Sequence, residues 1–88
     1  MTVLFERSFA KDIRILREHS LRTAIQKTIA SVKESHSLNA MPQCKKLRGY
    51  ENVYRLRCGD YRIGITLEGD EVTFVRCLHR KELYKYFP

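Results

Sequence analysis

The sequence predicts an α+β fold, in which two N-terminal helices pack on one face of a small antiparallel sheet and a short helix ends the chain. Apolar residues recur at helical spacing in the N-terminal part, and apolar and polar residues alternate through most of the second half. Tight turns at Gly59-Asp60 and Glu68-Gly69-Asp70 separate the alternating stretches. The predicted order of elements is therefore β-α-α-β-β-β-α.

The first strand is expected over residues 2–6, TVLFE, which are rich in β-formers. Ser8 is expected to cap the helix that follows, because a serine hydroxyl can accept a hydrogen bond from an amide of the first turn. Phe9, Ile13 and Leu16 lie at positions i, i+4 and i+7, so they mark the buried face of this helix.

The second helix has the clearest helical period in the chain, and Ser20 is expected to cap it. Its apolar face carries Leu21, Ala24, Ile25, Thr28, Ile29 and Val32. Residues 36–45, which include Asn39 and Pro42, are expected to form a loop.

Three strands are expected after this loop, over residues 52–58, 61–67 and 71–78. The helix-covered face of the sheet would hold Tyr54, Leu56, Tyr61, Ile63 and Ile65. The opposite face would present Arg55, Arg57 and Arg62. A final short helix is expected from about Arg80 to Phe87, with Leu83 and Phe87 on one face.

The composition is that of one small domain, which is expected to span residues 1–88. No stretch approaches the roughly 20 apolar residues that cross a bilayer, and the N-terminus lacks the apolar core of a signal peptide. We therefore expect a soluble, cytoplasmic protein. Cys44, Cys58 and Cys77 form no CxxC pair and are expected to be free thiols. No residues have metal-ligand spacing, so no metal or other cofactor is expected.

The net charge of +7 is concentrated in two segments of the second half. Residues 43–62 carry six basic and two acidic residues, and residues 76–88 carry four basic and one acidic residue. The segment between them, residues 63–75, has a net charge of −3. Such an excess indicates an anionic partner, which is nucleic acid, a membrane surface or an acidic protein.

The arginines beside the Gly59-Asp60 turn give a second reason to expect an anionic partner. Arg57 and Arg62 should lie near each other across the hairpin, and like charges placed so destabilise a sheet by roughly 0.2–1 kcal/mol per pair. Folding alone gives no reason to group them, whereas a docked polyanion does, because guanidinium groups bind phosphate with two parallel hydrogen bonds. A merely solvated sheet face remains the alternative interpretation.

Three segments together resemble the RelE toxins of the RelE/ParE superfamily, which are bacterial type II toxin-antitoxin proteins. They are SFAKDIRIL in the first helix, KKLRGYENVYRLRCGDYRIGI around the hairpin, and HRKELYKYF at the end. The resemblance implies a metal-independent endoribonuclease that cuts mRNA in the ribosomal A site and so inhibits translation. The 2′-hydroxyl would attack the adjacent phosphate. The implied partners are the ribosome, mRNA and a cognate antitoxin.

The resemblance also implies roles for individual residues. Arg62 matches a catalytic arginine, Arg80 matches a C-terminal arginine, and Tyr84 matches a tyrosine thought to activate the 2′-hydroxyl or to stack on a base. Arg55 and Arg57 match lysines of the best-known members, and we assign both to phosphate and transition-state contacts because arginine does not act as a base. The expected catalytic set therefore includes Arg57, Arg62, Arg80 and Tyr84. The expected RNA-binding residues are Lys45, Lys46, Arg48, Arg55 and Lys81.

The general acid and base stay open. His79 is the one nearby residue whose side chain ordinarily titrates close to neutral pH, so it joins the expected catalytic set, with a structural role at the end of a strand as the alternative. Two other functions also remain open. One is that of the ParE branch, whose toxins poison DNA gyrase, and the other is a noncatalytic module that binds RNA or an antitoxin.

Overall fold

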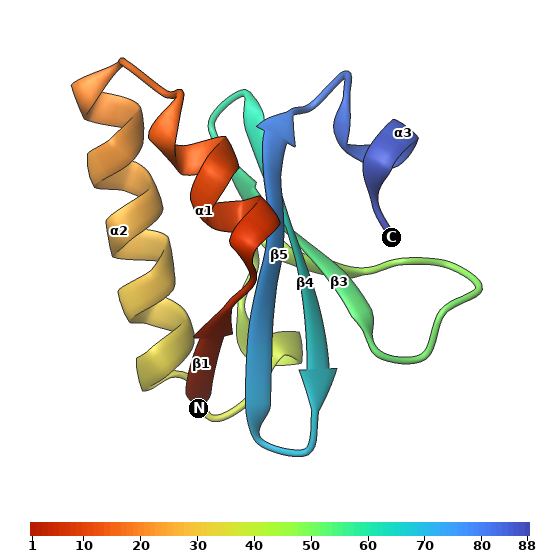
Figure 1. Ribbon diagram of the computed structural model, residues 1–88. Coiled ribbons are helices and arrows are strands. Elements are labelled where there is room, and N and C mark those ends of the chain that lie inside the picture. The colour runs from red at the N-terminus through yellow and green to blue at the C-terminus, as the bar shows by residue number, and fades with distance from the viewer.

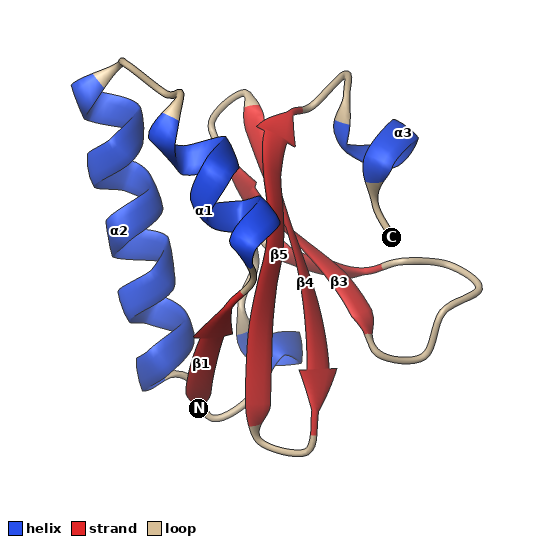
Figure 2. Cartoon of the chain, viewed as in Figure 1, coloured by secondary structure: helices blue, strands red, loops and turns tan.

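Two helices lie on one face of a five-stranded sheet, and a short helix lies on the other face (Figure 1). The computed structural model describes residues 1–88. The elements are β1 (Thr2–Phe5), α1 (Arg7–Arg14), α2 (His19–Glu34), a 3-10 turn (Leu38–Ala40), β2 (Cys44–Lys46), β3 (Val53–Cys58), β4 (Tyr61–Glu68), β5 (Glu71–His79) and α3 (Leu83–Tyr86). The predicted α+β class, with both N-terminal helices on one face, is confirmed (Figure 2). None of the helices combines the length and the apolar character that crossing a membrane requires.

The sheet has the strand order β1-β5-β4-β3-β2 and differs from the prediction in two ways. β1 runs parallel to β5, so the sheet is mixed and not purely antiparallel. The expected loop over residues 36–45 is wrong at its end, because Cys44 begins β2 and lies opposite Leu56 of β3. β2 has only three residues, which are too few for alternation to reveal a strand.

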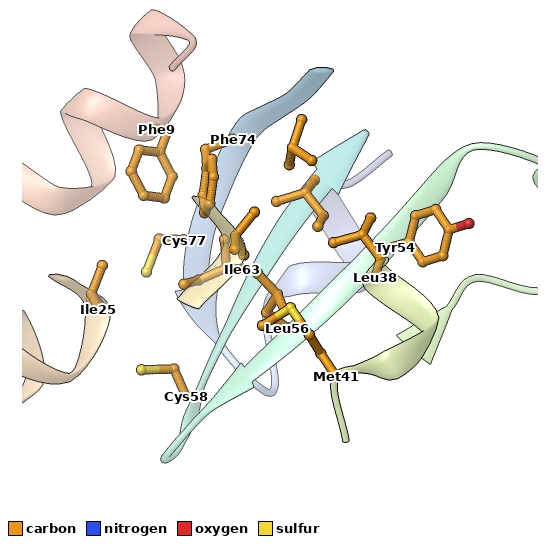
Figure 3. Packing of buried hydrophobic residues seen from close by; sticks show 13 residues of the cluster. Phe9, Ile25, Leu38, Met41, Tyr54, Leu56, Cys58, Ile63, Phe74 and Cys77 are labelled. Carbon is orange, nitrogen blue, oxygen red and sulfur yellow. The ribbon is translucent and has the colours of Figure 1, made fainter. Parts of the chain in front are cut away.

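The main core lies between the helices α1 and α2 and the sheet (Figure 3). Leu56, Ile63 and Ile65 are fully buried there, as their alternation predicts. Phe9 of α1 packs edge-on against Phe74 of β5, with 5.4 Å between ring centroids. Because each fully buried aliphatic or aromatic side chain contributes about 1.5–3 kcal/mol, this face supplies most of the stability and leaves the opposite face for other roles.

A β-bulge interrupts the pairing of β4 and β5. Gly64 lies opposite Arg76 and Ile65 lies opposite Phe74, so Val75 has no partner on β4. A bulge shifts the alternation of a strand by one residue. Phe74 and Cys77 therefore both face the core although three positions separate them, and the residues beyond Val75 face the opposite way from a regular strand.

The two expected serine caps are wrong. α1 begins at Arg7 after Glu6, and the Ser8 hydroxyl donates to the Val75 carbonyl oxygen at 2.6 Å. α2 begins after Glu18, and the Ser20 hydroxyl donates to the Glu18 carboxylate at 2.8 Å. Both hydroxyls lie inside the first turn, so each binds a neighbouring oxygen instead of the helix amides.

The C-terminal helix is shorter than the expected span from Arg80 to Phe87, because only residues 83–86 are helical. Leu83 and Phe87 share one face, as predicted, and both are buried. Neither residue belongs to the main core. α3 lies on the face of the sheet that α1 and α2 leave open (Figure 1). A Cβ atom added to Gly64 would lie 2.6 Å from the Phe87 ring, so this ring rests directly on the backbone of β4.

Gly64→Ala is expected to destabilise the fold by about 1–3 kcal/mol, because the added methyl group overlaps the Phe87 ring. Urea denaturation followed by circular dichroism measures this change. Phe87→Leu in the Gly64→Ala background should recover part of the loss, because it frees space above residue 64. An equal cost of Gly64→Ala with either residue at position 87 would contradict this packing.

The three cysteines are free, as expected, and Cys44 is the most exposed of them. Burial raises the pKa of the Cys44 thiol to about 11 from its ordinary 9.0, an effect that Arg55 only partly offsets. At pH 8 this leaves far less thiolate than in a free thiol, so we expect iodoacetamide to alkylate Cys44 at least about tenfold more slowly than N-acetylcysteine. Mass spectrometry of a time course measures both rates. Equal rates at pH 8 would contradict the claim that burial raises the pKa of the Cys44 thiol.

Candidate functional site

The exposed face of the sheet gathers the arginines on adjacent strands. Arg57 of β3 lies directly opposite Arg62 of β4, and Arg55 lies between Lys45 of β2 and Gly64 of β4. The opposite sides of β3 and β4 carry the buried core residues, so these cations project away from α1 and α2. The grouping that the sequence predicts is confirmed by this register.

These arginines have no acidic partners. The three ion pairs of the molecule join Arg76 to Asp12, Arg80 to Asp60 and Lys85 to Glu82. Arg55, Arg57 and Arg62 therefore have no carboxylate within 4.0 Å. A guanidinium group stays charged at physiological pH, so this face carries uncompensated positive charge.

The Arg62 side chain is oriented by its own hairpin. One terminal nitrogen, Nη1, donates to the carbonyl oxygens of Gly59 at 2.9 Å and Tyr61 at 3.0 Å. Partial desolvation, followed by the charges of Arg55, Arg57 and Arg80, lowers the pKa of Arg62, and Tyr84 partly offsets this. The remaining nitrogens make no protein hydrogen bond and are free to bind an anion.

Arg80 lies at the same end of the hairpin. Its backbone amide donates to the Asp60 carbonyl oxygen at 2.8 Å, which ties the end of β5 to the turn. Its Nε atom is 3.9 Å from the Asp60 carboxylate, and both side chains are mostly exposed. Such exposed pairs contribute roughly 0–1 kcal/mol, so Arg80 can exchange this carboxylate for a phosphate.

A cavity of about 470 Å³ adjoins the arginines. Its lining residues are Lys45, Lys46, Leu47, Arg48, Arg55 and Tyr84. Tyr84 comes from α3, and the other five come from β2, β3 and the connection between them. One aromatic ring beside four cations is a suitable environment for a nucleotide, whose base stacks on rings and whose phosphate binds cations.

The structure does not bring His79 to this face. His79 lies opposite Tyr61 on the neighbouring strand, and their rings meet edge-on with centroids 5.7 Å apart. Tyr61 packs against the main core, so His79 faces α2 and not the arginines. Its Nδ1 atom accepts a hydrogen bond from the Lys81 amide at 3.2 Å. The Lys81 side chain is exposed and does not line the basic cavity. The bulge at Val75 is the cause, because it reverses the facing of the strand beyond it.

Two residues of the site were not predicted from the sequence. Gly64 accommodates Phe87 and so allows α3 to lie close to the sheet. Leu47 lines the cavity between the lysines and Arg48. A glycine inside an alternating strand often marks a close approach of another chain segment, so Gly64 carried a signal that could have revealed this contact.

The comparisons with known proteins agree on one family. A model described as the ParE toxin of type II toxin-antitoxin systems, parDE, matches residues 3–84. This chain belongs to the RelE/ParE superfamily of type II toxins. It is similar to Toxin RelE3 of Methanocaldococcus jannaschii, with 46% identity over 89 residues that cover all of both chains.

Solved structures of RelE/ParE toxins share this fold. A chain of the RelB-RelE antitoxin-toxin complex from Methanococcus jannaschii is 44% identical, with a TM-score of 0.80 over 97% of this chain and 99% of that one. The intact RelBE toxin-antitoxin complex of E. coli contains a chain that is 24% identical, with a TM-score of 0.70 over 89% of this chain and 94% of that one. At 24% identity, the E. coli chain shows only that the two proteins share a fold.

Proposed function

We propose that this RelE/ParE toxin is a ribosome-dependent endoribonuclease that cuts mRNA in the ribosomal A site and so inhibits translation. The observation that carries the proposal is the group of unpaired arginines, Arg55, Arg57 and Arg62, beside a basic cavity that Tyr84 lines. The proposed target also implies action in the cytoplasm. The proposed partner is a RelB-like antitoxin, since the 44% identical relative was solved in complex with RelB.

The proposed reaction is an internal transfer of the phosphoryl group. The 2′-oxygen bonds to phosphorus, the bond to the 5′-oxygen breaks, and a cyclic phosphate and a 5′-hydroxyl result. The 2′-hydroxyl proton is lost, and the leaving 5′-oxygen gains a proton. Negative charge builds up on the phosphate oxygens in the transition state, where fixed guanidinium groups stabilise it more than the ground state. Arg57, Arg62 and Arg80 are assigned this role.

The cavity is assigned to the nucleotides beside the scissile phosphate. Lys45, Lys46, Arg48 and Arg55 would bind the phosphate backbone, which gives an affinity that falls with salt concentration. Tyr84 is 60% exposed on the rim of this cavity, and its hydroxyl makes no hydrogen bond within the protein. An exposed ring of this kind suits stacking on a base.

Tyr84→Leu is expected to weaken RNA binding about tenfold, whereas Tyr84→Phe should stay within about threefold of the wild type. The reason is that stacking needs the ring and not the hydroxyl, and one stacked base contributes about 1–3 kcal/mol. Fluorescence anisotropy with a labelled single-stranded RNA measures the affinities. A Tyr84→Phe variant that binds normally but cleaves more than tenfold more slowly would instead assign the hydroxyl to catalysis.

A cell-free translation assay with mapping of mRNA 3′ ends tests the proposed function. Cuts at A-site codons should appear with the wild type and fall about 10²–10³-fold with Arg57→Ala. Lys27→Ala is the control, because it removes the same charge from the exposed side of α2, on the opposite side of the sheet. Continued translation of intact mRNA in the presence of the wild-type protein would contradict the proposed nuclease function.

The second candidate function is inhibition of DNA gyrase, which the match to the ParE-toxin model favours. The two functions make opposite predictions in simple assays. A gyrase inhibitor would block supercoiling of plasmid DNA by purified gyrase and leave mRNA intact. The unpaired arginines beside the Tyr84 cavity favour the nuclease, since they provide the charge that a pentacoordinate phosphate requires.

A further inference from the structure

The helix α3 needs outside support to hold its position. It has four residues, about one turn, and isolated helices shorter than about 12–15 residues are only marginally stable in water. Leu83 and Phe87 anchor its inner side on the sheet, with Phe87 resting on Gly64. These two apolar contacts set the height of the helix above the sheet. A residue that contacts its outer part is needed to set its rotation, which decides where Tyr84 points.

Arg76 of β5 makes such a contact. The centre of its guanidinium group lies 5.7 Å from the centroid of the Tyr86 ring, within the range of a cation–π interaction. Arg76 faces α3 because of the bulge at Val75, which places it opposite Gly64 on the exposed face. Tyr86 itself is 61% exposed, and this contact joins its ring to β5.

The guanidinium group of Arg76 is itself immobilised by α1. Its Nε atom donates to Asp12 Oδ2 at 2.8 Å, and its Nη2 atom donates to Oδ1 at 3.1 Å. Asp12 Oδ2 also accepts the backbone amide of Cys77 at 2.9 Å. Asp12 is buried, and the paired hydrogen bonds fix the plane of the guanidinium group as well as its position.

We propose that Arg76 is a positioning residue for the nuclease site. Held by Asp12, it binds the Tyr86 ring and thereby sets the rotation of α3, so that Tyr84 lies over the basic cavity. Arg76 does not line that cavity, so it acts through Tyr86 and Tyr84 and not by binding RNA. The activity part of this inference rests on the proposed function, whereas the part that concerns α3 rests on the geometry alone.

The experiment combines amide hydrogen exchange with RNA cleavage in the full chain. The amide of Phe87 donates to the Leu83 carbonyl oxygen at 2.8 Å, so its exchange rate reports the opening of α3. Tyr86→Leu removes the ring at an exposed position and should leave the core folded. Tyr86→Phe is the matched control, because it keeps the ring. Gly64→Ala, which displaces Phe87, is the positive control for exchange.

Tyr86→Leu is expected to speed exchange of the Phe87 amide about two- to fivefold, the range that one exposed cation–π contact contributes to an equilibrium. Arg76→Lys should have a similar effect, because an ammonium group cannot keep both the paired Asp12 bonds and the contact with Tyr86. The double variant should exchange no faster than the single variants. Tyr86→Phe should match the wild type.

RNA cleavage separates positioning from general stability. Tyr86→Leu should lower cleavage about two- to fivefold in the wild-type background and have no further effect in a Tyr84→Leu background. An equal loss in both backgrounds would mean that Tyr86 acts otherwise than through Tyr84 and would overturn the positioning role. Unchanged exchange in Tyr86→Leu would overturn the contact itself. If the wild type cleaves no RNA, the proposed function fails, and the exchange rates still decide whether Arg76 holds α3.

Discussion

Arg62→Ala is expected to lower the rate of mRNA cleavage about 10²–10³-fold, the loss typical of removing one preorganised donor to a developing oxyanion. Arg62 is oriented by two carbonyl oxygens of its own hairpin, so little reorganisation is needed when the phosphate arrives. Its neighbours Arg57 and Arg80 would remain, which is why some activity should survive. The rate is measured by the appearance of mapped 3′ ends in the cell-free translation assay.

The matched control is Arg7→Ala, which removes the same charge from an exposed position on α1. It should leave cleavage unchanged. Arg62→Ala should also change the free energy of unfolding by less than about 1 kcal/mol, since the repulsion from Arg57 that it relieves is of that order. If both variants lost activity to the same extent, net charge alone would explain the loss and Arg62 would have no specific role.

Asp12→Ala is expected to destabilise the fold by about 3 kcal/mol, at the lower end of the range for breaking a buried ion pair. The buried carboxylate satisfies the Arg76 guanidinium group and the Cys77 amide, and both would lose this partner. The lower end applies because the Arg76 side chain is 25% exposed, so water can solvate it in part. For a chain of 88 residues this predicts a fall in Tm of roughly 12–24 °C, measured by calorimetry.

Asp60→Ala provides the comparison for this prediction. It also removes a carboxylate that faces an arginine, but the Asp60 side chain is 79% exposed and lies 3.9 Å from Arg80. Its loss should cost less than about 1 kcal/mol. Similar costs for Asp12→Ala and Asp60→Ala would mean that burial and the Cys77 hydrogen bond add nothing to the Asp12 pair.

The hairpin of β3 and β4 could be predicted from the sequence because its geometry is local. Alternation with a period of two assigns each side chain to a face, and a two-residue turn at Gly59-Asp60 sets the register. These two rules together place Arg57 opposite Arg62. The charged face, and with it the interpretation as an anion-binding surface, therefore followed from the order of residues along one short segment.

The facing of β5 and the place of α3 were decided only by tertiary structure. The bulge at Val75 reverses the strand beyond it, so His79 turns toward α2 and Arg76 turns toward α3. A bulge of this kind depends on contacts with other elements, here the Ser8 hydroxyl on the Val75 carbonyl and the Asp12 carboxylate on the Cys77 amide. Both partners lie more than 60 residues away along the chain, where no local pattern can register them.

Within the candidate site, the placement of the arginines follows from local sequence, whereas the placement of the other residues depends on tertiary contacts. The sequence by itself determined which strands carry the cations, because side-chain facing within a hairpin is a property of neighbouring residues. Only the tertiary structure decided that Tyr84 meets Lys45 and Arg48 at one cavity, since α3 reaches this place through Phe87 on Gly64 and Tyr86 on Arg76. A one-turn helix has too few hydrogen bonds to set its own position, so packing against distant residues must set it.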